Sequence, residues 1–417
     1  MIAPEHDRRY LQRNLPLYFA YSFLMNFALW GGIWIKYLLD ERGMQLKWIL
    51  LMDLPFWLIV AAAQAPTGAL ADHIGRKRVM AIGSLLFSIT ILGFGFTTNY
   101  WILFAVYIVW GFAQAMQTGA DSAMLYDSLK AAGQERKYQR YAGRGFATVL
   151  TAGMVSVVLG GLAAEVTSLA FIVKVSALTP LLAMIVCFFL KEPPVAKRKD
   201  RHYLRDMRAS FDFAWHNKPI RYSVLMFSVL LTGTFGPVVL IQPFLLNHDI
   251  PTGLYGVFQA PLRLTAVVAA LLAFRISARL GPSRVLVGAC SAIVLSYAGL
   301  AAIDTTAAFA FFALPGFIQG ITRPVIDGYI NERTPSERRA TVLSLAQLCF
   351  ALQVAWFEPM LGFLTDDISL AAAFVVSAVY FGVVMPPMVY LWRRAHREGE
   401  RVAALRLAPA VGAPGSG

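Results

Sequence analysis

Residues 68–78 read Gly-Ala-Leu-Ala-Asp-His-Ile-Gly-Arg-Lys-Arg, at the end of one apolar run, 47–70, and before another, 79–97. Gly75 permits the backbone conformation of a tight turn, and three basic residues follow it directly. Asp72 precedes the turn, where its carboxylate can accept hydrogen bonds from the start of the following helix. The pattern predicts a short, basic loop that joins two membrane-spanning helices.

The composition of the whole chain agrees with a membrane protein. Apolar residues make up 58% of the 417 residues and charged residues 15%, whereas soluble domains have about 45–50% and about 25%. These values exclude a large soluble enzyme and a disordered chain. A disulfide framework or a cysteine-based metal site is not expected, because the three cysteines are far apart in apolar runs: Cys187, Cys290 and Cys349.

Twelve apolar runs are long enough to cross a membrane, which takes about 20 residues of helix. They lie at 17–39, 47–70, 79–97, 101–126, 142–164, 169–190, 220–245, 253–277, 284–303, 307–330, 340–363 and 370–392. The predicted fold class is therefore an all-α integral membrane protein with twelve transmembrane helices.

The distribution of Lys and Arg predicts the orientation. Of the 37 basic residues, 31 lie in the N-terminus, in every second loop and in the C-terminal tail. The excess of positive charge on one side places both termini in the cytoplasm. The compact loops and the arginine-rich cytoplasmic face favour a bacterial inner membrane. The net charge of +13 is explained by these loops, so nucleic acid is not an expected partner.

The chain also divides into two similar halves. Gly75 and Gly281 are 206 residues apart, and so are Asp121 and Asp327. Two six-span repeats are typical of transporters whose substrate site lies between the repeats, near the middle of the bilayer. The predicted parts are a six-helix bundle at 1–190, a cytoplasmic linker at 191–219 with an amphipathic helix at 203–215, a six-helix bundle at 220–395, and a disordered cytoplasmic tail at 396–417.

Residues 68–78 resemble the G-x-L-a-D-r-x-G-r-K signature of the major facilitator superfamily, which lies between the second and third spans. The resemblance extends over the chain through the twelve spans, the two halves and the long central linker. It implies two pseudo-symmetric six-helix bundles, a monomer without cofactor or metal, and a transport function like that of bacterial drug and metabolite exporters.

The same residues form a predicted gating motif. Gly68 is small enough for a neighbouring helix to approach closely, and Arg76 can pair with a carboxylate at a nearby helix end. The resemblance implies that Asp127 is this partner, and that Asp72, Gly75 and Arg76 belong to a network that latches the outward-facing state. The alternative is that the basic loop is only a signal for membrane topology.

Span five carries small residues at Ala152, Ser156 and Gly160. Their four-residue spacing permits close packing against span eight of the other half, and ordinary packing of small residues between helices is an equal alternative. Val157 stands where proton-coupled antiporters of the superfamily carry a proline, so the resemblance to antiporters is incomplete at this position.

The resemblance implies that spans one, four, seven and ten line the substrate cavity. Their polar residues are Asn26, Gln114, Gln117, Asp121, Thr232, Gln319, Arg323 and Asp327. Gln114, Gln117 and Asp121 recur at intervals of three and four and should share one helical face. Asp121 and Asp327 lie near the cytoplasmic ends of their spans, so anchoring at the interface is an equal alternative for them.

Three charged residues lie deeper in predicted spans: Asp53, Arg263 and Glu358. Intramembrane charges are costly and usually functional. Asp53 and Glu358 are expected to lie close together, because spans two and eleven face each other in the superfamily, and such a pair can carry a proton. A purely structural pair of Arg263 with Glu358 is the alternative.

These observations predict a secondary transporter that moves a small organic molecule by rocker-switch alternating access. Proton-coupled efflux of drug-like or lipophilic compounds is the first expectation, with H+ as coupling ion and the lipid bilayer as surroundings. Proton-coupled uptake of a polar metabolite, with Arg323 binding a carboxylate or phosphate, is the second. A membrane enzyme is less favoured, because no G-x-x-x-x-G-K-[ST] or H-E-x-x-H motif is present.

Overall fold

The computed structural model describes residues 5–194, 211–335 and 338–407, and its regular elements are helices. The first half contains α1 (Glu5–Gln12), α2 (Asn14–Asn26), η1 (Leu29–Gly32), α3 (Trp34–Lys36), η2 (Tyr37–Glu41), α4 (Leu46–Leu51), α5 (Asp53–Ile74), α6 (Arg76–Phe96), α7 (Tyr100–Gln117), α8 (Ala120–Ala131), η3 (Glu135–Lys137), α9 (Tyr138–Ala163), α10 (Leu169–Ser176) and α11 (Leu178–Phe189). The second half contains α13 (Lys218–Asn247), η4 (Thr252–Leu254), α14 (Tyr255–Ala302), η5 (Thr306–Phe312), α15 (Ala313–Arg333), α16 (Arg339–Asp367) and α17 (Leu370–Leu407).

Ten helices in the described ranges are long and apolar enough to cross a membrane. The first predicted span differs because the backbone of Phe27 and Ala28 leaves the helical region and divides the span into α2, η1, α3 and η2. The tenth predicted span corresponds to α15 and is also not among these ten helices. It is long enough to cross a membrane but carries several charged residues. With these two segments the chain has the predicted all-α, twelve-helix membrane fold.

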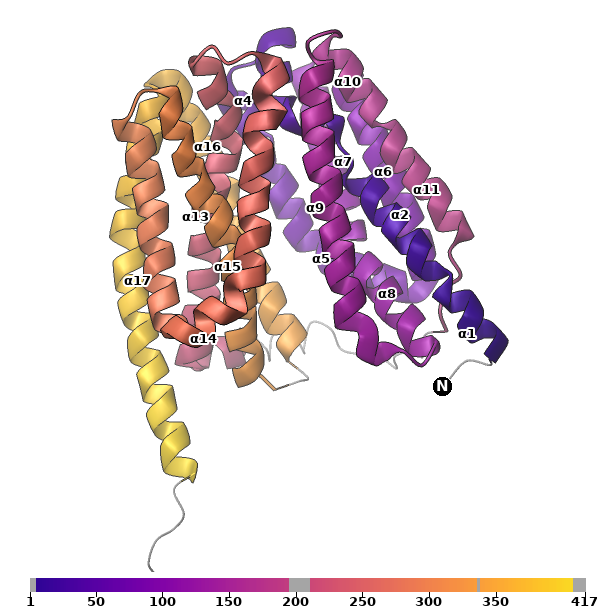
Figure 1. The fold of residues 1–417 in the computed structure, drawn as a ribbon, viewed down its shortest axis with the longest axis vertical. Helices are drawn as coiled ribbons and strands as arrows, with labels where there is room; N and C mark the ends of the chain where they lie inside the picture. Colours follow the sequence, from indigo (N-terminus) through magenta and orange to yellow (C-terminus); the bar gives the residue numbers. More distant parts are fainter. Residues whose placement is uncertain (1–4, 195–210, 336–337, 408–417) are drawn as a thin grey trace, which may run out of the picture.

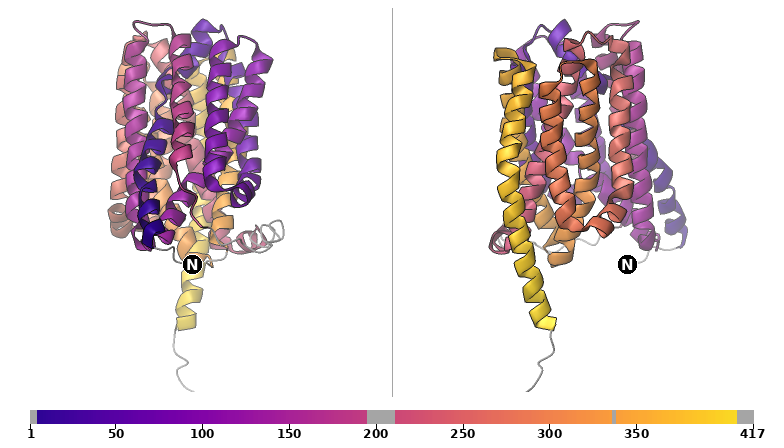
Figure 2. Two further views of the ribbon diagram at one scale, coloured as in Figure 1. Left: turned by 90° about the vertical axis from the view of Figure 1, so that its right-hand side faces the viewer. Right: turned by 60° about the vertical axis from the view of Figure 1, so that its left-hand side comes forward.

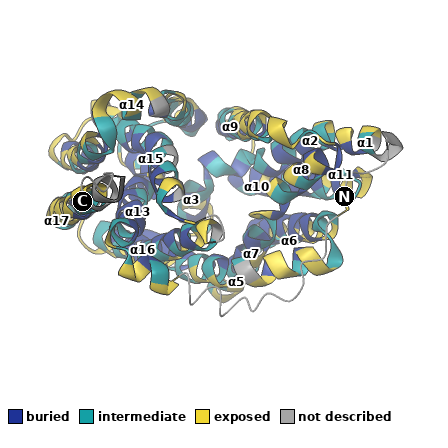
Figure 3. Ribbon diagram, turned by 90° about the horizontal axis from the view of Figure 1, so that it is seen from below, coloured by how far each residue is buried: buried dark blue, intermediate teal, exposed yellow. Residues whose placement is uncertain are grey.

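Each half has its own hydrophobic core. One core is built from residues 21–190, and the other mainly from residues 214–392. Seen along the bundle axis in Figure 3, α13 to α17 form one group of helices and α2 with α5 to α11 form the other. Many large apolar side chains outside these cores are exposed, as expected for surfaces that face lipid.

The turn at Gly75 has a counterpart at the same place in the second half. Gly75 has φ 96° and ψ 147°, and Gly281 has φ 74° and ψ 156°. Both conformations are accessible chiefly to glycine. Gly281 makes a kink inside α14, so the predicted spans eight and nine are the two arms of that element.

The two halves approach each other at one end of the molecule and separate toward the other. Figure 1 shows the separation at the end that carries the N-terminus and the last turns of α17, here called the terminal end. At the opposite end the backbone N–H of Lys47 donates to Asp366 at 2.7 Å, and the N–H of Gly253 donates to Glu165 at 2.6 Å. This arrangement closes the opposite end.

Glycines bring the halves together along α9 and α14. A Cβ at Gly256 would overlap the carbonyl oxygen of Val157, and one at Gly161 would lie 3.0 Å from the carbonyl oxygen of Gly253. Span five thus packs closely against span eight, but through Val157 and Gly161. Of the small residues on which the prediction rested, Gly160 faces the carbonyl oxygen of Leu29 in the first span. α5 and α16 form the second contact between the halves, as Figure 3 also shows.

Two predicted segments differ from the structure or lie partly outside it. α17 continues as a helix to Leu407 and extends beyond the bundle (Figure 2), although disorder was predicted from residue 396. Of the predicted amphipathic helix at 203–215, the residues before 211 lie outside the described ranges. The rest is helical, with the exposed rings of Phe211 and Trp215 stacked at 5.8 Å.

Candidate functional site

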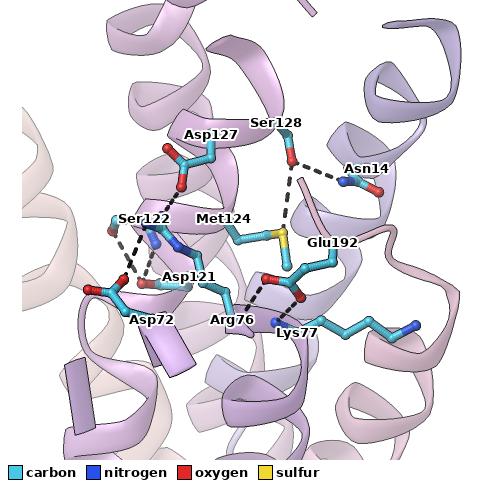
Figure 4. Close-up of polar contacts among 10 residues, drawn as sticks. All are labelled: Asn14, Asp72, Arg76, Lys77, Asp121, Ser122, Met124, Asp127, Ser128 and Glu192. Carbon is cyan, nitrogen blue, oxygen red and sulfur yellow. Dashed lines mark hydrogen bonds and ion pairs between the residues drawn. The ribbon is translucent and has the colours of Figure 1, made fainter. Parts of the chain in front are cut away.

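The basic turn between α5 and α6 is fixed by a carboxylate from the end of the first half. Glu192 accepts hydrogen bonds from the backbone N–H of Arg76 at 2.7 Å and of Lys77 at 2.9 Å (Figure 4). A carboxylate is favourable here because the first N–H groups of a helix lack internal partners. The predicted cap, Asp72, does not occupy this position. Its side chain is 53% exposed.

Gly75 is required for two reasons. Its positive φ disfavours other residues, and a Cβ would lie 3.0–3.3 Å from the carboxyl group of Glu192. Gly68 is different, because a Cβ there would meet no atom within 4 Å. The close helix approach predicted at Gly68 is therefore wrong for this structure.

Arg76 forms an ion pair with Asp127, the partner that the resemblance implied, while Asp72 lies 3.9 Å away (Figure 4). All three residues belong to the first half, and no described residue of the second half joins them. The pair is formed while the halves are separated at the terminal end. The pairing of Arg76 with Asp127 within the first half is thus as predicted, and its role as a latch of the outward-facing state stays a prediction.

Asn14 joins the same region from the first span. Its side chain donates to Ser128 Oγ and to the carbonyl oxygen of Lys191, both at 2.9 Å. The N–H of Lys191 donates back to Asn14 Oδ1 at 3.0 Å. Sequence reasoning missed Asn14 and Glu192. Glu192 is 116 residues from Arg76, so only the folded chain brings the two together.

The polar residues of span four lie on two helices, so Asp121 on α8 is separated from Gln114 and Gln117, which remain together on α7. The helix is interrupted between α7 and α8 at Thr118 and at Gly119, whose φ is 95°. Gln117 donates weakly to the carbonyl oxygen of Gly83 at 3.4 Å, whereas Asp121 accepts from the N–H of Ser122 at 2.6 Å. This break interrupts the spacing of three and four residues on which the prediction rested. Gln114 is partly buried in α7.

The other predicted cavity residues lie in several environments. Asn26 ends α2 and donates to the carbonyl oxygen of Ser22 at 2.9 Å. Thr232 is 1% exposed and bonds within its own half, to Gln353 at 3.2 Å. Gln319 is partly buried. The side chains of the remaining two lie outside the described part of the structure: Arg323 and Asp327.

Asp53 and Glu358 meet where α5 and α16 bring the two halves together. Their exposed fractions are 8% and 2%. Asp53 and Trp57 are one turn apart on α5, and Trp57 donates its indole N–H to Glu358 Oε2 of α16 at 3.0 Å. No described Lys, Arg or His forms an ion pair with either carboxylate. Phe235 and Phe350 pack edge-on against Trp57 at 5.4 and 5.3 Å.

Arg263 lies on the other contact between the halves, where α14 meets α9. A Cβ at Gly153 would overlap Nη1 of Arg263, so the glycine leaves the space that the guanidinium occupies. The predicted structural pair with Glu358 is not formed. Among the described residues, Arg263 has no ion pair or hydrogen bond.

The interrupted first span contacts both halves. Trp30 N–H donates to Ser176 Oγ in its own half at 3.3 Å. From the second half, Gln242 accepts from the N–H of Ile35 at 2.9 Å and of Lys36 at 3.2 Å. Gln259 donates to the carbonyl oxygen of Gly32 at 2.9 Å. A polar group buried in the membrane needs a partner, and these glutamines satisfy groups that the interruption leaves free.

Comparisons with known proteins agree with this architecture. The sequence profile of the Major Facilitator Superfamily matches residues 17–357. A homologue of the multi-drug resistance efflux pump PmrA from Lactococcus lactis subsp. lactis (strain IL1403) is 25% identical over 330 residues, which are 75% of this chain and 77% of the homologue.

Two solved structures share the fold. The crystal structure of a variant of the nucleoside transporter NupG aligns with a TM-score of 0.74 and 16% identity, over 91% of this chain and 99% of NupG. A bacterial homologue of the human lysosomal transporter Spinster, inward-facing and unoccupied, aligns with a TM-score of 0.71 and 14% identity, over 95% and 99%. The profile covers most of the chain, and its match, the helices and the shared fold agree. The chain therefore belongs to the major facilitator superfamily, and it is a membrane transporter, not an enzyme.

Proposed function

We propose that the protein is a proton-coupled exporter of lipophilic, drug-like compounds that works by rocker-switch alternating access. The observation that carries this proposal is the pair Asp53 and Glu358, which are buried and come from different halves of the molecule. A site made by both halves changes when the halves move, so its protonation is linked to the movement.

The physical argument starts from the cost of two buried carboxylates. Two like charges near each other in a medium of low dielectric repel strongly, and no described cation compensates them. A proton bound by the pair removes one charge and stabilises the contact between α5 and α16. When the halves separate at the opposite end, water reaches the pair and the proton can exchange. The indole N–H of Trp57 fixes the orientation of Glu358.

The direction of transport is supported by the efflux pump homologue, which is similar over three quarters of the chain. Export fits a bacterial cytoplasmic membrane with both termini in the cytoplasm, and we propose this location and orientation. The substrate cavity then lies between the halves and opens to the cytoplasm at the terminal end.

The test uses inverted membrane vesicles with a respiration-driven proton gradient and a pH-quenched dye. Addition of transported compounds from a panel of lipophilic cations, neutral drugs and small acids should dequench the dye in vesicles with the wild-type protein. Glu358→Gln and Asp53→Asn should abolish the response, because an amide cannot exchange the proton. Glu135→Gln, in the exposed η3, is the matched control and should respond like the wild type.

Exchange of a labelled substrate without a proton gradient separates coupling from folding. Both amide variants should retain this exchange if they are folded and bind substrate. A gradient-driven response that persists in Glu358→Gln and Asp53→Asn would refute the proposed coupling site. A response that appears only in right-side-out vesicles would refute export and support uptake.

A further inference from the structure

We propose that Arg263 determines substrate specificity by binding an anionic group, a carboxylate or sulfonate, of the transported compound. This inference rests on the proposed function and narrows its substrate class to amphiphilic anions. Three features carry it: the depth of Arg263, its place at the boundary between the halves, and the lack of a counter-charge among the described residues.

Arg263 lies near the middle of the apolar span Thr252–Ala273. An arginine at this depth is costly unless a carboxylate, backbone carbonyl groups or water surround it. Its guanidinium is directed at the first half, where Gly153 leaves room for it. The charge is therefore placed between the halves, at the level where transporters of this architecture bind their substrates.

The face of α14 that carries Arg263 closes the opposite end of the molecule just beyond it. Gly256 packs on the carbonyl group of Val157, and Gln259 donates to Gly32. Residues 259 and 263 are one turn apart on this face. Arg263 is thus the next polar residue toward the terminal end, where the halves separate (Figure 1). A substrate that enters from that side reaches Arg263 before it reaches the closed contacts.

The buried acidic residues near the contacts between the halves, and the exposed Glu165 at the opposite end, are engaged elsewhere in the described chain. Asp53 and Glu358 lie in the contact of α5 with α16, and Glu165 binds the N–H of Gly253. The backbone position of Asp327 is also unsuitable. Gly316 lies beside Leu262, and Gly320 beside Ala266, so residue 327 is about 15 Å farther along the parallel helix α15.

A guanidinium is suited to an anionic ligand because it is always charged and donates in a rigid fork that matches two carboxylate oxygens. Its hydrogen bonds with the anion would be strong in a medium of low dielectric. The acidic pair and Arg263 lie on the two separate contacts between the halves. A bound anion and a bound proton therefore act on different contacts between the halves.

The first experiment measures binding to the purified full-length protein in detergent by the shift in its unfolding temperature. The probes are 1-naphthoate, 2-naphthalenesulfonate and the neutral 1-naphthamide, which share an aromatic body. The two anions should stabilise the wild type, and the amide should not. Arg263→Gln should weaken the apparent affinity for naphthoate about tenfold or more, which corresponds to the loss of a charge-assisted hydrogen bond.

Two further variants complete the test. Arg279→Gln removes an exposed charge from the same helix and should keep the wild-type preference, which excludes unspecific attraction to a basic protein. Arg263→Lys keeps the charge but loses the fork, and should bind naphthoate more weakly than the wild type. This variant decides the question if Arg263→Gln does not fold. Equal binding of naphthoate and naphthamide by the wild type, or an unchanged preference in the Arg263 variants, would overturn the proposal.

Counterflow of labelled naphthoate in proteoliposomes without a proton gradient separates this inference from the proposed coupling. Counterflow that is lost in Arg263→Lys and retained in Glu358→Gln supports the anion site, whether or not transport is driven by protons. Absence of gradient-driven transport together with an intact preference for anions would refute the proposed proton coupling and leave the anion site at Arg263 supported. Counterflow that is the same in the wild type and Arg263→Lys would contradict the anion site.

Discussion

The hydrogen bonds from Gln242 and Gln259 to the interrupted first span should stabilise the state that is closed at the opposite end. Three bonds cross the boundary between the halves there, at 2.9, 3.2 and 2.9 Å. Both side chains are buried, with exposed fractions of 2% and 9%. The double substitution Gln242→Leu/Gln259→Leu removes all three bonds and retains most of the side-chain volume.

The size of the effect follows from the difference between the two states of the transporter. In the closed state the N–H groups of Ile35 and Lys36 and the carbonyl group of Gly32 lose their partners, whereas in the open state water can reach them. At about 1 kcal/mol for each bond, the loss is about 3 kcal/mol. The equilibrium should therefore shift about 150-fold toward the state that is open at the opposite end.

The shift can be measured as a distance between spin labels at Thr98 and Thr306, which are exposed at the opposite end in different halves. The double variant should show a longer distance than the wild type. Gln117→Leu is the matched control, because its amide bonds Gly83 within one half. An unchanged distance in the double variant, or the same increase in Gln117→Leu, would refute the reasoning.

Two further predictions compare glycines that differ in one respect. Gly75→Ala should lower the unfolding temperature in detergent more than Gly281→Ala does. Both glycines have a positive φ, but only Gly75 faces a carboxylate, that of Glu192. Equal decreases in the unfolding temperature would contradict this role of Glu192. Gly256→Leu should prevent cross-linking of cysteines introduced at Lys47 and Asp366, because the leucine side chain would meet the carbonyl group of Val157. At Gly288 a leucine would project into open space, so Gly288→Leu should leave the cross-link intact.

The sequence predicts the features that depend on local composition and regular spacing. The spans follow from apolar runs, and the turn glycines follow from the repeat of 206 residues. The contact of Arg76 with Asp127 came from the resemblance, because no spacing within one helix joins them. The packing of span five against span eight was also predicted, but Val157 and Gly161 make this contact, whereas Gly160 of the predicted spacing faces Leu29.

The features that the sequence does not predict depend on breaks in helices and on long-range contacts. The interruption begins at Phe27 and Ala28, before the pair Gly31 and Gly32. Its free groups are bonded by residues more than 200 positions away. The helix break at Thr118 and Gly119 lies within a regular spacing of polar residues and separates Gln117 from Asp121. Arg263 and Glu358 carry opposite charges, which suggested an ion pair, but they lie in different contacts between the halves.

The interrupted first span also has a consequence for the synthesis of the protein. Its segment from η1 to α3 is completed by partners 207 and 227 residues later in the chain. At about 5–20 residues per second, these partners leave the ribosome about 10–45 s after the segment itself. The first helix to be inserted is therefore among the last to reach its final structure, and a chaperone or the insertion machinery has that interval in which to hold it.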